Sequence, residues 1–161
     1  MGERKVFSMQ IVNFSDKYWD EFHHLISDHW KKDHPILNKA LFTWQYTGFG
    51  GDRGQWATKL LFVDGKLVGF RGIIPGVYQV PSGSGMKYRD GAGLAMWLVH
   101  PLYRGKRLGY RLFQEVEQQY SVLLTLGSNK KTAQPFYLRN RFSHLHALHR
   151  YVVPLEAEGY V

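Results

Sequence analysis

Hydrophobic positions in the first third of the chain recur mostly at helical spacing. Residues 4–12 alternate and predict a strand, whereas apolar residues between Ser15 and Trp30 recur three and four positions apart. That spacing is typical of an amphipathic helix, with Ser15 as its N-cap. After the break at Pro35, a second and shorter helix is expected to end before Gly48. A glycine-rich loop follows it.

Two apolar runs in the middle of the chain predict an antiparallel hairpin. Residues 55–63 and 66–80 are separated only by the pair Asp64-Gly65. A two-residue Asp-Gly link between apolar runs favours a tight turn between paired strands. Pro75 cannot donate a hydrogen bond to a strand ladder, so it should mark a bulge or an edge in the second strand.

The second half of the chain predicts alternating strands and helices. Residues 81–93 are rich in glycine and serine and predict a flexible loop, in which 86–89 could extend a strand. The elements expected after it are a strand at 93–99, a helix at about 107–120, a buried strand at 121–128, a helix at 130–142 and closing strands at 142–153. Because a helix connects them, the strands at 93–99 and 121–128 should be parallel.

A short basic turn joins the strand at 93–99 to its helix. The turn reads RGKRLG at residues 104–109. At the start of a helix, backbone N–H groups without intrahelical partners and the positive end of the helix dipole point to one place. Proteins hold phosphate groups at such a place. We therefore expect a ligand that carries a diphosphate.

Composition narrows the class of protein. The 161 residues, 44% of them hydrophobic, fit one globular domain over residues 1–161, which could belong to a longer protein. The absence of cysteine excludes disulfides, thiolate metal sites and a cysteine nucleophile, and it agrees with a cytoplasmic location. No apolar segment is long enough to cross a membrane. We expect a soluble protein.

The charge points to anionic partners. The formal net charge is +8, from 21 Lys and Arg against 13 Asp and Glu. Nucleic acid, acidic membranes and phosphorylated small molecules all fit such a charge. The sequence carries no helix-turn-helix, zinc-binding or aromatic ribonucleoprotein pattern, so we expect no nucleic-acid partner. A phosphorylated small molecule remains the preferred ligand.

The basic turn resembles the acetyl-CoA-binding signature of the GNAT N-acetyltransferases. That signature is (Gln/Arg)-x-x-(Gly/Ala)-x-(Gly/Ala), and this chain supplies Arg104 at the first place and Gly109 at the last. Arg107 stands where the family has the middle glycine. A glycine there lets the backbone approach the phosphates closely, so Arg107 implies a different cradle or an extra cation beside the cofactor.

A second pattern strengthens the resemblance. Asn129, Ala133, Tyr137 and Phe142 are similar to the family's N-x-x-A-x-x-x-Y-x-x-x-G-F pattern, with Arg141 in place of its glycine. We expect the loop at Arg141 to manage without the usual left-handed residue. The order of elements also resembles the family, which implies a mixed α/β (α+β) fold. Its central sheet would be largely antiparallel and flanked by helices, with one splayed parallel strand pair.

The resemblance implies an acetyl-CoA-dependent N-acetyltransferase. Acetyl-CoA would be the cosubstrate, no metal would be needed, and a primary amine of a small molecule would attack directly in a ternary complex. An amino sugar is the preferred acceptor class, and a homodimer is compatible with the family. The alternative is a catalytically silent GNAT-like module that binds coenzyme A or a protein partner.

The resemblance also assigns site residues. Tyr137 would donate a proton to the coenzyme A thiolate, which suits an unperturbed pKa of about 10. Asp90, upstream of the strand, is the candidate base, with His100 less favoured; an amine that loses its proton to water needs neither. The residues expected to bind the cofactor are Trp97, Leu98, Val99, Arg104, Gly105, Lys106, Arg107, Leu108, Gly109, Tyr110 and Asn129.

Overall fold

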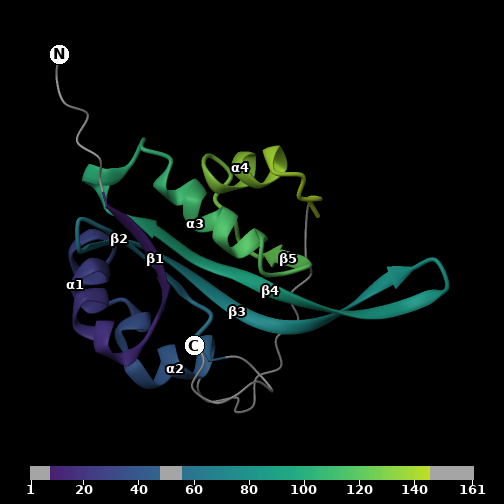
Figure 1. Ribbon diagram of the computed structural model, residues 1–161, viewed down its shortest axis with the longest axis horizontal. Helices are drawn as coiled ribbons and strands as arrows, with labels where there is room; N and C mark the ends of the chain where they lie inside the picture. Colours follow the sequence, from purple (N-terminus) through teal and green to yellow (C-terminus); the bar gives the residue numbers. More distant parts are fainter. Residues whose placement is uncertain (1–7, 48–55, 146–161) are drawn as a thin grey trace, which may run out of the picture. The chain divides into compact units, whose positions relative to one another are not determined.

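A five-stranded sheet with the order β1-β2-β3-β4-β5 runs through the computed structural model, which describes residues 8–47 and 56–145 (Figure 1). Neighbouring strands are antiparallel except β4 and β5, which are parallel. The strands are β1 (Met9–Asn13), β2 (Lys59–Val63), β3 (Lys66–Ser82), β4 (Gly85–Val99) and β5 (Val122–Thr125). This arrangement confirms the mixed, mostly antiparallel sheet that the sequence predicts.

The chain divides into two compact units, Met1–Leu126 and Gly127–Val161. All five strands belong to the first unit. The single domain expected from the sequence stays a prediction. Four predicted segments lie wholly or partly outside the described residues: the start of the first strand, the glycine-rich loop after the second helix, the first residue of the strand at 55–63, and most of the closing strands. The described part of the closing segment, residues 142–145, contains no strand.

The turn between β2 and β3 follows the sequence prediction. Asp64 and Gly65 both have positive φ, 48° and 75°. Two consecutive left-handed residues form the type of turn whose twist matches antiparallel strands. The Asp64 side chain also accepts a hydrogen bond from the Ser8 N–H at 3.0 Å. The Asp-Gly pair therefore sets the register next to the turn, at Val63↔Lys66 and Phe62↔Leu67, and a bulge between Leu61 and Phe62 shifts the register beyond it.

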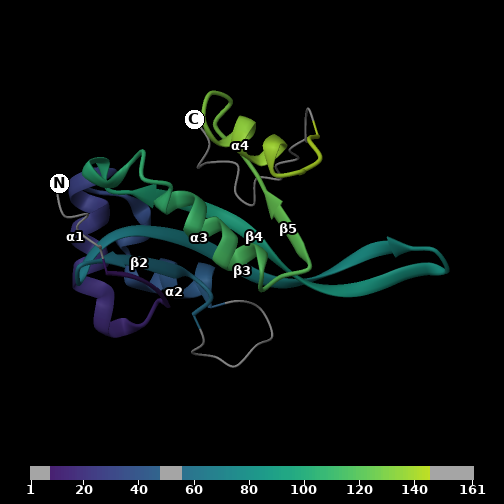
Figure 2. The same ribbon diagram turned by 45° about the horizontal axis from the view of Figure 1, so that its top comes forward.

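The predicted flexible loop at 81–93 is wrong, because most of it is strand. Pairing of β3 with β4 continues to Ser82↔Gly85 at the tip, and the two strands extend beyond the rest of the sheet (Figures 1 and 2). Within the described residues, β2 pairs with β3 only as far as Arg71, so Pro75 lies on an edge, as predicted. This two-stranded ribbon at the end of β3 and the start of β4 is largely exposed, with Tyr88 at 75% exposure. It therefore lacks the alternation of apolar and polar residues that identifies a half-buried strand in a sequence.

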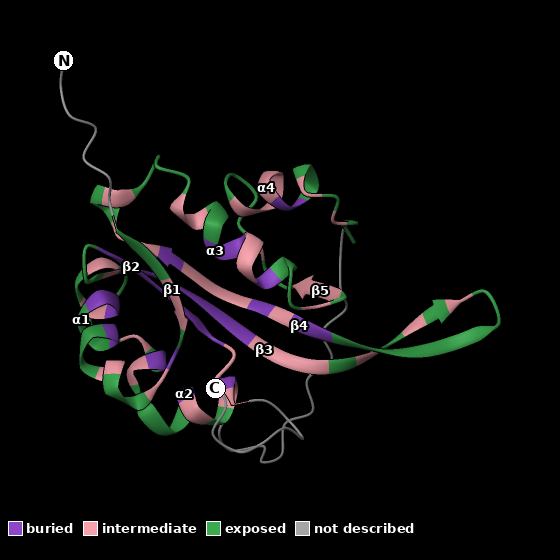
Figure 3. Cartoon of the chain, viewed as in Figure 1, coloured by how far each residue is buried: buried purple, intermediate pink, exposed green. Residues whose placement is uncertain are grey.

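Helices cover both faces of the sheet (Figure 3). Helices α1 (Trp19–His29) and α2 (Lys39–Tyr46) lie on one face, and α3 (Leu108–Glu117) lies on the other. Phe22 of α1 and Phe42 of α2 are buried together with Phe14, with ring centroids 4.7 to 5.6 Å apart. Leu112 of α3 packs with buried residues of β2 and β3. Burial of this apolar surface on both faces stabilises the sheet.

The first helix begins differently from the prediction. Ser15 precedes a short 3-10 turn, Asp16–Tyr18, and its side chain makes no capping hydrogen bond. Its hydroxyl is buried without a partner among the described residues. The regular helix starts only at Trp19, because the 3-10 turn takes up the first residues after Ser15. Ser15 marks the helix start in the sequence but does not cap it.

The second unit contains helix α4 (Ala133–Arg139), shorter than the predicted 130–142. Arg141 follows it with a left-handed φ of 66°, contrary to the expectation that this loop manages without such a residue. The Phe142 N–H donates to the Tyr137 carbonyl at 3.1 Å, and the Arg141 N–H donates to the Leu138 carbonyl at 3.2 Å. These two bonds form a Schellman motif, which requires a left-handed residue after the helix whatever its side chain.

Candidate functional site: an open strand edge that leads to a helix N-terminus

The last residues of β4 have an unpaired edge. In the described chain, β5 pairs with β4 only from Gly91 to Leu94. Trp97, Leu98 and Val99 pair on their other side with β3, and no described strand pairs with them on the β5 side. Apart from the Val99 carbonyl, which accepts from the Arg104 side chain, the backbone groups on that side need partners, and an extended ligand can supply them in the manner of an added strand. All three are residues that the sequence assigns to the cofactor.

A bulge lies where the two parallel strands part. Arg71 pairs with Trp97, but Ile73 pairs with Leu94, so β4 carries one extra residue at Ala95-Met96. An extra residue bends a strand and increases its local twist. The bend begins one residue after the last β4–β5 pair. The bulge therefore accounts for the divergence of β4 from β5.

The turn after β4 is tied back to the strand. It forms the 3-10 helix Pro101–Tyr103, after which the Arg104 N–H donates to the Pro101 carbonyl at 3.2 Å. The Arg104 side chain folds back, and its Nε donates to the Val99 carbonyl at 3.0 Å. Arg104 occupies the first place of the signature. Its contact fixes the distance between the open edge and the start of α3.

Arg107 is the N-cap of α3 and has a left-handed backbone, with φ 58° and ψ 13°. Glycine adopts this conformation freely, whereas an L residue pays about 1 kcal/mol or more. The Arg107 side chain is exposed and makes no capping hydrogen bond to its helix. The turn therefore has, at Arg107, a backbone conformation that glycine would adopt without strain, and the arginine side chain is exposed.

Gly109 allows α3 to approach β4 closely. A Cβ on Gly109 would lie 3.0 Å from Cζ2 and 3.3 Å from Cε2 of Trp97. The Trp97 ring lies in turn over the guanidinium of Arg71, 4.8 Å from the ring centroid, and Arg71 is buried. The helix N-terminus thus sits against a residue of the open edge. The N–H groups of Leu108 and Gly109, in the first helical turn, have no intrahelical acceptor.

Four cations surround this helix N-terminus. Arg104, Lys106, Arg107 and Arg111 are all exposed. The Lys106 ammonium lies 5.1 Å from the centroid of the Tyr103 ring. Positive side chains beside free N–H groups attract polyanions. The open edge and this cation-rich helix start follow each other along the chain, so an extended ligand with an anionic end can contact both.

Sequence analysis missed Arg71 as part of this site. The sequence does contain a sign of its burial, because Arg71 is a single arginine inside the apolar run KLVGFRGIIPGV. A buried cation in such a run needs a partner, and the Trp97 ring provides one. The partner could not be identified from the sequence, because the two residues meet only through the pairing of β3 with β4.

Asp90 lies apart from the open edge. It is exposed in the β3–β4 ribbon, where it pairs with Val77. Leu94, where β5 leaves β4, is four residues further on, about 13 Å along a strand. Residues 95–99 contain no carboxylate. The structure therefore does not bring the candidate base to the site.

Two further predicted residues, Asn129 and Tyr137, belong to the second unit. The Asn129 Oδ1 accepts hydrogen bonds from the N–H groups of Lys131 at 2.8 Å and Thr132 at 3.3 Å, which stabilises the turn before α4. Tyr137 is only 5% exposed, and its ring centroid lies 4.9 Å from that of Phe142. Both residues have clear structural contacts within their own unit.

The left-handed backbone of Arg107 gives a direct test of this geometry. We expect Arg107→Gly to raise the free energy of unfolding by about 1 kcal/mol, because glycine removes the backbone strain. Urea denaturation measures it. Arg111→Gly is the matched control: the same change inside the right-handed part of α3 should lower stability by about 1 kcal/mol. A loss of stability in Arg107→Gly would contradict the assignment.

Comparisons with known proteins agree with this architecture. The sequence model of the acetyltransferase (GNAT) family matches residues 19–142. Among solved structures, the aminoglycoside N-acetyltransferase AAC(6')-Iy in complex with CoA is similar at a TM-score of 0.66, with 17% identity over 93% of this chain and 97% of that one. AAC(6')-Ih from Acinetobacter baumannii has a TM-score of 0.62 and 16% identity over 93% and 100%.

A GNAT family acetyltransferase from Brucella melitensis in complex with acetyl-CoA has a TM-score of 0.57, with 17% identity over 85% of this chain and 84% of that one. At these identities the similarity concerns the fold. No curated protein matches the chain in sequence. In the described residues, no helix is both long and apolar enough to cross a bilayer.

Proposed function

Because the chain belongs to the GNAT acetyltransferase family, we propose that it transfers an acetyl group from acetyl-CoA to a primary amine of a small-molecule acceptor. One observation carries the proposal: the open edge of β4 leads directly to the N-terminus of α3, where Gly109 lies against Trp97. An extended arm that ends in a diphosphate fits this arrangement. Coenzyme A has that shape.

Backbone groups would hold most of the cosubstrate. The free edge of Trp97, Leu98 and Val99 would bind the pantetheine arm, and the N–H groups of Leu108 and Gly109 would bind the diphosphate. Exposed cations around the helix start, Arg104 to Arg111, would balance its charge. When bound, acetyl-CoA supplies an acyl group already activated as a thioester. The chain would position the cosubstrate and balance the charge of its diphosphate.

The chemistry then needs little from side chains. The acceptor amine, in its neutral form, attacks the acyl carbon directly and loses its proton to water, since the open edge carries no carboxylate. A backbone N–H of the open edge would polarise the carbonyl. The Tyr137 hydroxyl would donate a proton to the departing thiolate and regain one from water, so that the thiol and the acetylated amine are the products.

An amino sugar is the acceptor class that we propose. The structures that share this fold include two enzymes described as aminoglycoside N-acetyltransferases, and one was solved with a bisubstrate analogue of CoA and acetylneamine. The first helix offers acidic side chains, Glu21 and Asp28, in a surface pocket. Carboxylates of this kind favour a cationic acceptor.

Calorimetry with coenzyme A and acetyl-CoA tests the proposal. We expect saturable binding with a micromolar Kd, followed by thiol release when amino sugars and aminoglycosides are added with acetyl-CoA. Control reactions that contain acetyl-CoA but no amine give the background rate of thioester hydrolysis. Absence of binding at millimolar coenzyme A would refute the proposed function.

A catalytically silent module is the second candidate. Two features favour it: the open edge has no carboxylate, and arginines stand at both left-handed positions where the family signatures have glycine. Such a module would bind coenzyme A and show no turnover with any amine. The amine panel separates it from the enzyme.

A further inference from the structure

Two turns of the chain are capped by histidine in the same way. His34-Pro35-Ile36 and His100-Pro101-Leu102 each open a 3-10 helix. In the first, the His34 Nδ1 accepts from the Ile36 N–H at 3.1 Å; in the second, the His100 Nδ1 accepts from the Leu102 N–H at 3.2 Å. A nitrogen that accepts a hydrogen bond carries no proton. Both caps therefore require a neutral imidazole with its proton on Nε2.

The His100 turn is the one that joins the two halves of the candidate site. His100 directly follows the open edge, and its N–H donates to the Val68 carbonyl at 2.8 Å. Its carbonyl accepts from the Tyr103 N–H at 2.9 Å, one residue before Arg104. The hydrogen bond from the Leu102 N–H to the His100 Nδ1 stabilises the same turn. Together with the Arg104 side chain, which donates to the Val99 carbonyl, His100 thus helps to position α3 relative to the edge.

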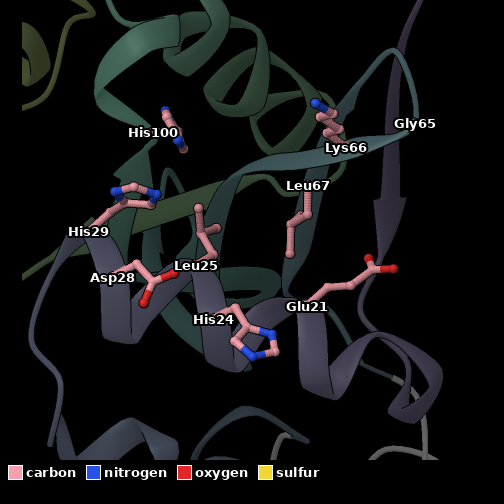
Figure 4. A pocket seen from close by; sticks show the side chains of 9 residues that line it. All are labelled: Glu21, His24, Leu25, Asp28, His29, Gly65, Lys66, Leu67 and His100. Carbon is pink, nitrogen blue, oxygen red and sulfur yellow. The ribbon is translucent and has the colours of Figure 1, made fainter.

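The surroundings of His100 disfavour its protonation. The His29 ring at the end of α1 contacts the His100 ring, with centroids 4.0 Å apart, and both line a surface pocket of about 360 Å³ (Figure 4). Desolvation, then the positive charges of His29 and Arg104, lower the pKa of His100 from its ordinary value. The other charged or titratable groups that line this pocket are Glu21, His24, Asp28 and Lys66, and the Tyr103 ring lies edge-on to the His100 ring at 5.4 Å.

We propose that His100 is a positioning residue whose neutral imidazole cap is required for tight binding of coenzyme A, so that binding weakens when His100 is protonated. A second proton would occupy Nδ1 and remove the acceptor of the Leu102 N–H. The turn would then loosen, and the helix N-terminus would no longer be held against the open edge. This inference rests on the proposed function.

The direction of the pH effect separates this cap from a simple charge effect. An imidazolium near the cations of α3 would by itself attract the diphosphate, so charge alone predicts tighter binding at low pH. Loss of the cap predicts weaker binding. Because the pKa of His100 is lowered, the neutral form that makes the cap is favoured at neutral pH, and the cap is lost as the pH falls through that lowered pKa.

The test is the Kd of coenzyme A between pH 5 and pH 8 for the full chain and three variants. Loss of one hydrogen bond corresponds to about a fivefold change in affinity. We expect the unsubstituted chain to bind about fivefold more weakly at the acid end, and His100→Ala to bind weakly throughout. His100→Asn should bind tightly throughout, because an asparagine oxygen can accept the same N–H and does not titrate in this range.

His34→Asn is the matched control and should keep the pH profile of the unsubstituted chain, because its turn lies before α2. The phosphate monoester of coenzyme A titrates near pH 6 but does so equally with every variant. Identical profiles for His100→Asn and the unsubstituted chain, or tighter binding at low pH, would overturn the role of His100. No binding at any pH would instead refute the proposed function.

Discussion

Tyr137→Phe should lower kcat for amine acetylation about a hundredfold and leave the Kd of coenzyme A nearly unchanged. The phenol is the proposed proton donor to the thiolate, and its contribution arises only as the thiolate forms. Phenylalanine keeps the ring contact with Phe142, so packing in the second unit should persist. Steady-state kinetics with thiol detection, together with calorimetry, measures both quantities.

Tyr88→Phe is the matched control for this substitution. Tyr88 is 75% exposed in the β3–β4 ribbon, so removal of its hydroxyl should change neither kcat nor affinity. A Tyr137→Phe variant with full turnover would show that another group, or water, protonates the thiolate. An unsubstituted chain that binds coenzyme A but shows no turnover would favour the silent module.

Gly109→Leu should weaken coenzyme A binding tenfold or more. The new side chain would start 3.0 Å from the Trp97 ring, which is held between Gly109 and the buried Arg71. Overpacking of this kind costs on the order of 1–3 kcal/mol, and here it would push the start of α3 away from the open edge. Calorimetry with coenzyme A measures the loss, and circular dichroism checks the fold.

Two further variants control the Gly109 experiment. Gly83→Leu places the same side chain at the tip of the ribbon, where a Cβ would meet nothing within 4 Å, and should leave the affinity unchanged. Gly109→Ala adds only the Cβ and should give an intermediate loss. If Gly109→Leu folds and binds coenzyme A as tightly as the unsubstituted chain, the diphosphate does not lie at this helix N-terminus.

The β3–β4 ribbon shows where sequence patterns fail. Residues 81–93 contain four glycines and two serines among few buried positions, a composition typical of loops. They nevertheless pair almost completely, because a hairpin can propagate from a well-anchored sheet through backbone hydrogen bonds alone. Strand prediction relies on burial of alternate side chains, and here little is buried.

Arg107 and Arg141, which stand where the family signatures have glycine, show a different limit of sequence-based prediction. A sequence reveals that glycine is missing but not which backbone conformation replaces it. Both Arg107 and Arg141 adopt the left-handed conformation, with φ of 58° and 66°. The surrounding hydrogen bonds and packing, such as the Schellman bonds around Arg141, outweigh about 1 kcal/mol of local strain. Both arginines therefore hold a backbone conformation that glycine would adopt without strain.

Local patterns in the sequence determined the Asp64-Gly65 turn, the parallel connection through α3 and the basic helix start after Val99, because each depends on residues close together in the chain. Only the tertiary structure decided that β5 leaves β4 after Leu94, that Arg71 lies under Trp97, and that His29 touches His100. Those contacts join distant segments, and their geometry follows from strand register and helix packing, which no short stretch of sequence specifies.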